Sequence, residues 1–237
     1  MSAHHKVSLI YVLTYSAKLS TCKYMSKKKR NKSGSGKTRR LHFPNDEKDH
    51  PWLKLLIDSY YVVDKGVAGA ISIKEKNGMN LACREGCSTC CHKDIPIYPL
   101  ELKGIAWYAA EKIKGLVREI LKNQLADFRR NQSCPFLVKN SCSIHQLRPM
   151  ACRQFNVFGT PCSEGEDPYY SRREDVMDPV KKYIDQAFFI MLSFHGIEKE
   201  SDRIKIIEDG SIHKMVKELH ACKWNHLADK MEKADTK

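Results

Sequence analysis

The stretch Cys83-Arg84-Glu85-Gly86-Cys87-Ser88-Thr89-Cys90-Cys91 places four cysteines within one short segment. On an α-helix, which turns about 100° per residue, their thiols would lie at about 0°, 40°, 340° and 80°, on one narrow face. Gly86 argues against a continuous helix, so we expect a glycine-kinked loop that leads into a helix at Ser88. Either geometry gathers soft sulfur donors, which favours zinc or an iron–sulfur cluster over magnesium or calcium.

The last two cysteines of this stretch, Cys90 and Cys91, are adjacent in sequence. Because neighbouring side chains diverge in both helix and strand, we do not expect both thiols to bind one ion in the same way. One of them would instead serve a second ion, bridge within a cluster, or be a buried bystander.

More cysteines follow downstream, and the clustering predicts metal ligands better than inert buried thiols do. His92 and His145 could each replace a thiol as a nitrogen ligand, although an ordinary polar role is the simpler expectation. Cys22 and Cys222 are expected to be spare thiols. The candidate metal ligands are Cys83, Cys87, Cys90, Cys91, Cys134, Cys142, Cys152 and Cys162.

The order of these blocks resembles the bacterial YkgJ-type cysteine-cluster family. The resemblance covers about residues 80–165 and rests on three blocks: 83–91, Cys134-Pro135-Phe136-Leu137, and the segment 142–155 that ends in Cys152-Arg153-Gln154-Phe155. The chain departs from the family at His145, where a tyrosine is usual. The resemblance implies a zinc- or iron-chelating domain, and it says little about biological role.

Composition places the basic charge outside this region. The net charge is +13, but residues 1–40 carry eleven Lys and Arg and no acidic residue. The rest of the chain is therefore nearly balanced, with 30 basic against 28 acidic residues. We expect residues 1–45 to be a basic tail, with 1–24 an upstream extension of the gene start, and residues 46–237 to be one domain with its metal-binding core at about 80–165.

The number and spacing of the cysteines also indicate the cellular compartment in which the protein is expected. Ten cysteines would suit a disulfide framework in a secreted protein, but their tight spacing and the weak export signal favour a reducing cytoplasm and metal binding. The apolar run 7–17 is too short to span a bilayer as a helix.

Hydrophobic periodicity predicts a mainly α domain built around a loop-borne metal centre, with little strand. We expect helices from Pro51 to Gly78, from Pro99 to Phe128 with a kink at Gly115, from an Asp178 N-cap to Gly196, and from Ser211 to Ala221. Residues 149–155 predict one helical turn, and Lys139-Asn140 predicts a turn or short hairpin.

Two functional groups beyond the thiols are of interest. Glu101 is expected to supply negative charge at a helix N-terminus, with the orientation of a metal ligand as the alternative. Arg84, Arg148 and Arg153 could offset the negative charge of a thiolate centre.

The first functional hypothesis is a metal-binding protein whose zinc or iron–sulfur centre is structural, handles metal or transfers electrons. The first alternative is a modification or redox enzyme related to flagellin lysine N-methylases, which carry a similar cluster in longer chains. The second alternative is a zinc-dependent nucleic-acid-binding module that uses the basic tail, although the domain charge and the lack of a finger-type His pair count against it.

Overall fold

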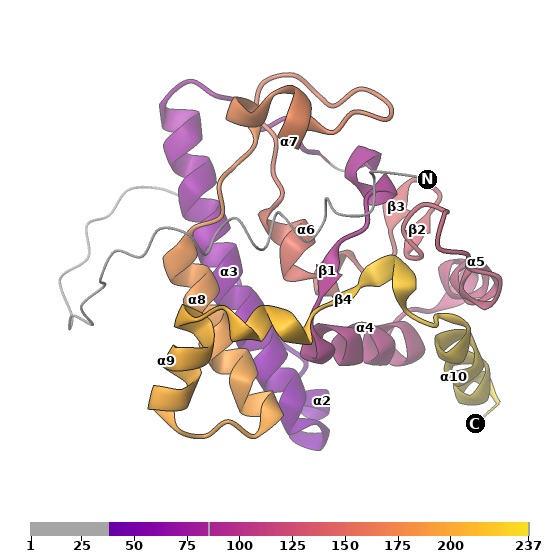
Figure 1. Ribbon diagram of the computed structural model, residues 1–237. Coiled ribbons are helices and arrows are strands. Elements are labelled where there is room, and N and C mark those ends of the chain that lie inside the picture. The colour runs from indigo at the N-terminus through magenta and orange to yellow at the C-terminus, as the bar shows by residue number, and fades with distance from the viewer. Residues whose placement is uncertain (1–37, 85, 237) are drawn as a thin grey trace.

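The computed structural model describes residues 38–84 and 86–236. Within that part of the chain, nine α-helices and two short antiparallel two-stranded sheets confirm the mainly α prediction (Figure 1). The helices are α2 (Pro44–Asp49), α3 (Pro51–Lys76), α4 (Pro99–Glu111), α5 (Gly115–Ala126), α6 (Met150–Gln154), α7 (Pro168–Ser171), α8 (Lys181–Met191), α9 (Glu200–Glu208) and α10 (Asn225–Asp235). The strands are β1 (Pro96–Ile97), β2 (Leu137–Val138), β3 (Ser141–Cys142) and β4 (Lys217–Glu218).

The long helix α3 and the antiparallel α8 form one side of the molecule (Figure 1). Pro51 occupies the first turn of α3, where its missing N–H costs nothing. A core cluster fills the space between α3, α8 and one face of α4, and it contains Leu56, Tyr60 and Phe188. The two helices approach closely at Gly66, because a Cβ there would lie 2.8 Å from the Tyr183 ring.

A second core cluster lies on the other face of α4, between α4, α5 and α10. It contains Ile105, Leu121 and Met231, and the β2–β3 hairpin covers it with Phe136. Helix α4 thus contributes side chains to both core clusters and links them.

The predicted helix from Pro99 to Phe128 is two helices, α4 and α5. Gly115 does more than kink the chain: it adopts a left-handed conformation (φ 63°) at the start of α5. Arg118 of α5 lies between the end of α4 and α10. Its buried guanidinium donates to the carbonyls of Ala109, Ala110 and Met231 at 2.8–3.0 Å.

The predicted turn at Lys139-Asn140 is confirmed as a two-residue hairpin. Leu137 pairs with Cys142 and Val138 with Ser141, and both turn residues have positive φ (49° and 59°). This is the pattern of a type I′ turn, whose twist matches that of the strands. The other sheet pairs Pro96 with Glu218, which ties the chain after the cysteine stretch to the C-terminal region.

The expectations for the last sixty residues are partly wrong. Asp178 does not cap α8, which begins at Lys181 after Val180, and its carboxylate instead pairs with Arg173. Residues 211–221 form two 3-10 turns separated by β4 rather than one helix, because pairing with β1 extends the chain there. The periodicity analysis also missed α9 and α10, while Gly196 ends the α8 segment as predicted (φ 72°).

Packing against the domain begins before residue 46. Arg40 pairs with Glu47 at 2.8 Å and with Asp58 at 2.6 Å, and Phe43 stacks edge-on against Trp107. The predictions for residues 1–24 and for Cys22 lie outside the described residues. Among the helices that the structure describes, none has the length and apolar character needed to cross a membrane.

Candidate metal centre

The first cysteine group, Cys83, Cys87, Cys90 and Cys91, lies on a loop that is hydrogen-bonded to a segment far along the chain. Leu81 bridges to Phe158, and Ala82 N–H donates to Val157 O at 2.8 Å. The N–H of Val157 in turn donates to Cys83 Sγ at 3.3 Å. Residues 80–83 therefore run beside 157–159, which orients the Cys83 thiol.

The chain then turns at Gly86, which has φ 81°, and enters a 3-10 helix at Thr89–His92 with Ser88 at its N-cap. This confirms the expected glycine-kinked loop and its entry point, although the helix is a single short turn. Cys87 and Cys90 are exposed, whereas Cys83 and Cys91 are half-buried.

The second group comes from three separate elements. Cys134 follows α5, Cys142 ends β3, and Cys152 lies in α6. The two groups are in direct backbone contact, because Cys134 N–H donates to Cys91 O at 2.7 Å. Phe136 and Ile144, each two residues from a cysteine of this group, are fully buried in the hydrophobic core. The core therefore fixes the backbone that carries Cys134 and Cys142.

Electrostatic coupling shows which thiols are neighbours. Burial raises the pKa of Cys152 far above normal and that of Cys134 to about 12, and a charge on Cys90 would raise both further. Burial likewise raises the pKa of Cys83 and Cys142, again with Cys90 as a further cause. Cys90 is thus within electrostatic reach of both groups.

The adjacent pair is in contact. Although Cys90 is exposed overall, its hydrogen bond with the Cys91 thiol, followed by burial, raises the pKa of Cys90 well above its usual value. Successive residues of a 3-10 turn still lie about 120° apart, so the expectation that the two thiols do not bind one ion in the same way stays a prediction.

Cys162 lies near the first group, because residues 157–159 run beside 80–83. Burial raises the pKa of the Cys162 thiol, and negative charge on Cys83 and Cys87 would raise it further. The positive charge of Arg172 lowers the same pKa. Arg172 Nη2 lies 3.7 Å from Cys162 Sγ. Neither this arginine nor the 156–177 segment that supports it was singled out from sequence, because no local pattern links them to residue 83.

Glu101 joins the second group to the core. Its fully buried carboxylate accepts Tyr98 N–H at 3.0 Å, at the start of α4, and Met150 N–H at 2.7 Å, at the start of α6. It therefore has the capping role expected of it, and it also docks the short helix that carries Cys152. Burial raises the pKa of Glu101 to about 7, while the two backbone donors lower it.

Arg153 anchors the same helix from its other side. Its guanidinium is buried, donates to both Asp64 oxygens at 2.8 and 3.0 Å, and stacks 4.0 Å from the Tyr60 ring centre. Its charge is thus largely neutralised by Asp64. Arg148 is within electrostatic reach of Cys83, Cys90, Cys142 and Cys152, and Arg153 also acts on Cys142.

The remaining sequence candidates are peripheral. His92 is exposed, and His145 is exposed with Nε2 against Arg148 Nη1. Arg84 is exposed as well. Cys222 lies apart, packs on the second core and donates to Glu218 O at 3.5 Å.

Across residues 38–84 and 86–236, no three His, Cys, Asp or Glu side chains converge closely enough to hold a metal ion as they stand. The thiols lie near one another but do not form a complete coordination shell for a metal ion. Their chemistry nevertheless fits the soft ions predicted from sequence, since sulfur donors suit zinc and iron. Bringing them to one ion requires deprotonation and small side-chain movements.

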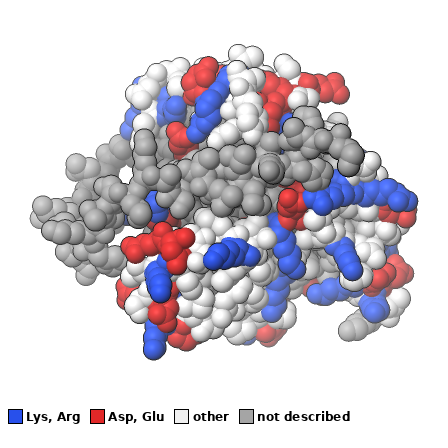
Figure 2. Space-filling view, viewed as in Figure 1, with Lys and Arg blue, Asp and Glu red and all other residues white. Residues whose placement is uncertain are grey.

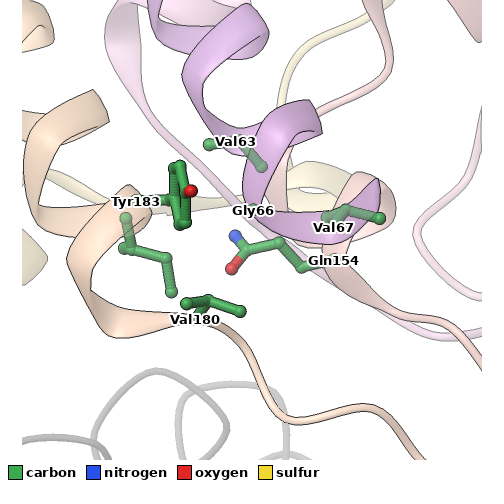
Figure 3. A pocket seen from close by; sticks show the side chains of 7 residues that line it. Val63, Gly66, Val67, Gln154, Val180 and Tyr183 are labelled. Carbon is green, nitrogen blue, oxygen red and sulfur yellow. The ribbon is translucent and has the colours of Figure 1, made fainter. Parts of the chain in front are cut away.

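Two cavities lie away from the cysteines. One, of about 10 Å³, is lined by Val63, Gly66, Gln154 and Tyr183 between α3 and α8 (Figure 3). This volume suits a single water molecule, for which the buried Gln154 Oε1, lacking a partner among the described residues, is an acceptor. The other is an open groove beside α9.

The fold and the site define a mainly α domain with a cysteine-rich, soft-metal donor set. Residues 82–179 match the model of the CxxCxxCC family, described as a "putative zinc- or iron-chelating domain". The match confirms the resemblance and supports metal binding by this segment, which includes all eight candidate cysteines. No curated protein and no solved structure matches the chain.

Proposed function

We propose that this protein holds zinc or an iron–sulfur cluster in one shared centre built from the two cysteine groups. The observation that carries the proposal is the direct contact between the two groups, in which Cys134 N–H donates to Cys91 O at 2.7 Å beside Cys90. The second group alone is one ligand short of a tetrahedral set. The vicinal pair can supply that ligand.

The proposed division of ligands follows from these neighbours. Cys83, Cys87 and Cys162 form one set, and Cys134, Cys142 and Cys152 form the other. Cys90 and Cys91 join them, one completing each set or both bridging a cluster. Soft thiolate coordination would then crosslink segments far apart in sequence, and the centre would have a structural, metal-handling or electron-transfer role.

Anaerobic purification, elemental analysis and a visible spectrum test the identity of the metal. Iron with acid-labile sulfide and a brown colour indicates a cluster, and a colourless protein with zinc indicates a zinc centre. A freshly purified chain without either metal contradicts the proposal.

Metal stoichiometry in cysteine variants tests whether the centre is shared. We expect Cys87→Ser and Cys152→Ser each to lose metal from both sets, so that the double variant loses little more than either single variant. Cys222→Ser is the matched control, because this half-buried cysteine lies outside both sets, and it should keep the full metal content. Independent losses that add in the double variant would show two separate sites.

The enzyme alternative makes a different prediction, namely an open coordination position beside a pocket. The two cavities described above are lined by none of the eight cysteines.

The nucleic-acid alternative concerns surface charge instead. On the face shown in Figure 2, basic (blue) and acidic (red) side chains are interspersed, without one large basic area on the described surface. The shared metal centre is the function that we put forward, because the backbones of the two cysteine groups are in direct contact.

A further inference from the structure

The segment between Gly159 and Asp175 is held together by one arginine. Arg172 Nε donates to Glu166 Oε1 at 2.7 Å, and its Nη1 donates to Asp175 Oδ2 at 2.9 Å. Glu166 is itself fixed, because it accepts Ser163 N–H and Ser171 O–H, each at 2.8 Å. The guanidinium therefore has little freedom to rotate.

This fixed orientation directs the Nη2 group, which also donates to Glu166 Oε2 at 3.5 Å, toward sulfur. Arg172 Nη2 lies 3.7 Å from Cys162 Sγ, within the range of an N–H···S hydrogen bond. The arginine side chain is only 16% exposed, so this charge-assisted contact is partly shielded from water. A thiolate at Cys162 would be the natural acceptor.

The segment is also docked on the cysteine loop. Phe158 N–H donates to Asp175 O at 2.8 Å, and Phe158 itself bridges to Leu81, two residues before Cys83. On the far side, Lys93 pairs with Asp167 at 3.5 Å, just after Cys91. The segment that holds Arg172 therefore contacts the chain on both sides of the first cysteine group.

We propose that Arg172 is the positioning residue of the first ligand set, holding the Cys162 sulfur beside Cys83 and Cys87 for metal binding. This inference rests on the proposed function. Hydrogen bonds to coordinating sulfurs orient the ligand and stabilise its anionic form, and their loss commonly weakens metal affinity by about 10- to 100-fold. Glu166 and Asp175 act through Arg172 by keeping its planar guanidinium in place.

A double-mutant cycle on the full chain tests the proposal. The four proteins are wild type, Arg172→Gln, Cys162→Ser and the double variant, and the readout is the metal retained against a graded chelator, measured by elemental analysis. We expect Arg172→Gln to lower retention by about 10- to 100-fold in apparent affinity. On the Cys162→Ser background the same change should have almost no further effect, because the coordinating sulfur that Arg172 positions is gone.

Two further variants separate positioning from folding. Arg173→Gln is the matched control in the same segment, since Arg173 pairs with the exposed Asp178 and stacks on Tyr169, away from the thiols. It should retain metal like the wild type. Arg172→Lys keeps the charge without the planar fork and should fall between wild type and Arg172→Gln.

The outcomes are distinct. An Arg172→Gln protein that retains metal like the wild type overturns the inference and leaves the shared centre standing. An equal loss on both backgrounds also overturns it, because the arginine would then act on the fold independently of Cys162. A wild-type chain without metal refutes the proposed function, and the inference fails with it.

Discussion

Glu101 shows how one buried side chain can serve two elements. Its two oxygens accept backbone N–H groups at the first turns of α4 and α6, and the carboxylate is inaccessible to water. The sequence pattern of Pro99 followed by Glu101 predicted only the first of these contacts. The second depends on α6, which begins 49 residues later.

The raised pKa of Glu101 gives stability a specific pH dependence. An unfolded glutamate has a pKa near 4.3, whereas burial raises the pKa of Glu101 to about 7. Between these values the folded chain holds a proton that the unfolded chain has lost, so stability from this group is full below about pH 4 and falls as the pH rises through 7. The loss should be on the order of 3 kcal/mol.

Comparison with Glu101→Gln isolates this effect. Glutamine stays neutral, so the variant should lack the Glu101 component of the pH slope, and its unfolding free energy relative to wild type should rise between pH 5 and pH 8. At pH 5 we expect it to be less stable by about 1 kcal/mol, since one backbone donor loses a good acceptor. Urea unfolding of both proteins at the two pH values measures the difference. Parallel slopes would mean that Glu101 stays ionised in the folded chain.

At the scale of elements, the contact between α3 and α8 depends on the absence of a side chain. Gly66 is buried against the Tyr183 ring, and Gly69, one turn later, faces open space. Both lie inside the same helix, where glycine costs about 1 kcal/mol relative to alanine. The two positions therefore separate helix propensity from packing.

Alanine at each position should have opposite effects. Gly66→Ala places a Cβ about 2.8 Å from the Tyr183 ring, and the overlap should destabilise the protein by about 1–3 kcal/mol despite the better propensity. Gly69→Ala should stabilise it by up to about 1 kcal/mol. Thermal unfolding of both variants gives the comparison. A Gly66→Ala protein as stable as Gly69→Ala would show that α8 shifts without cost.

Metal removal acts at the scale of the whole molecule. The first hydrophobic core packs α3 and α8 without any candidate cysteine, whereas Cys134 and Cys142 pack against the second core, and residues 80–95 and 130–165 contain many loops and short turns. We expect a strong chelator to increase hydrogen exchange across residues 80–165 while α3 and α8 stay protected, because metal binding energy is folding energy for the segment it crosslinks. Unchanged exchange in 80–165 after complete metal removal would contradict this coupling.

Truncation distinguishes the basic tail from the residues that pack on the domain. A chain starting at Thr38 should keep its metal content and melting temperature, since the basic stretch 27–37 that precedes the domain has no large apolar side chain to offset the entropy of ordering. A chain starting at Pro44 should lose about 1–3 kcal/mol, because it lacks Arg40, which pairs with Asp58, and Phe43, which packs on Trp107. Equal melting temperatures would show that these contacts contribute nothing measurable.

Local patterns in the sequence determined much of this protein. Proline at the first turn located α3 and α4, Lys139-Asn140 located the hairpin, and Gly86 located the break before the cysteine turn. Each of these features depends on backbone conformation within a few residues, which composition and spacing report directly. The thiol spacing likewise predicted the family that residues 82–179 match.

Tertiary structure decided what those patterns could not. Residues 211–221 are extended at β4 because β1 pairs with them, and Asp178 pairs with Arg173 instead of capping α8. Cys162 lies with Cys83 because residues 157–159 run beside 80–83, and Glu101 reaches α6 because both helices pack on one core. Apart from the local Asp178–Arg173 pair, these contacts join residues separated by dozens of positions, and no periodicity within a single segment encodes a partner that far along the chain.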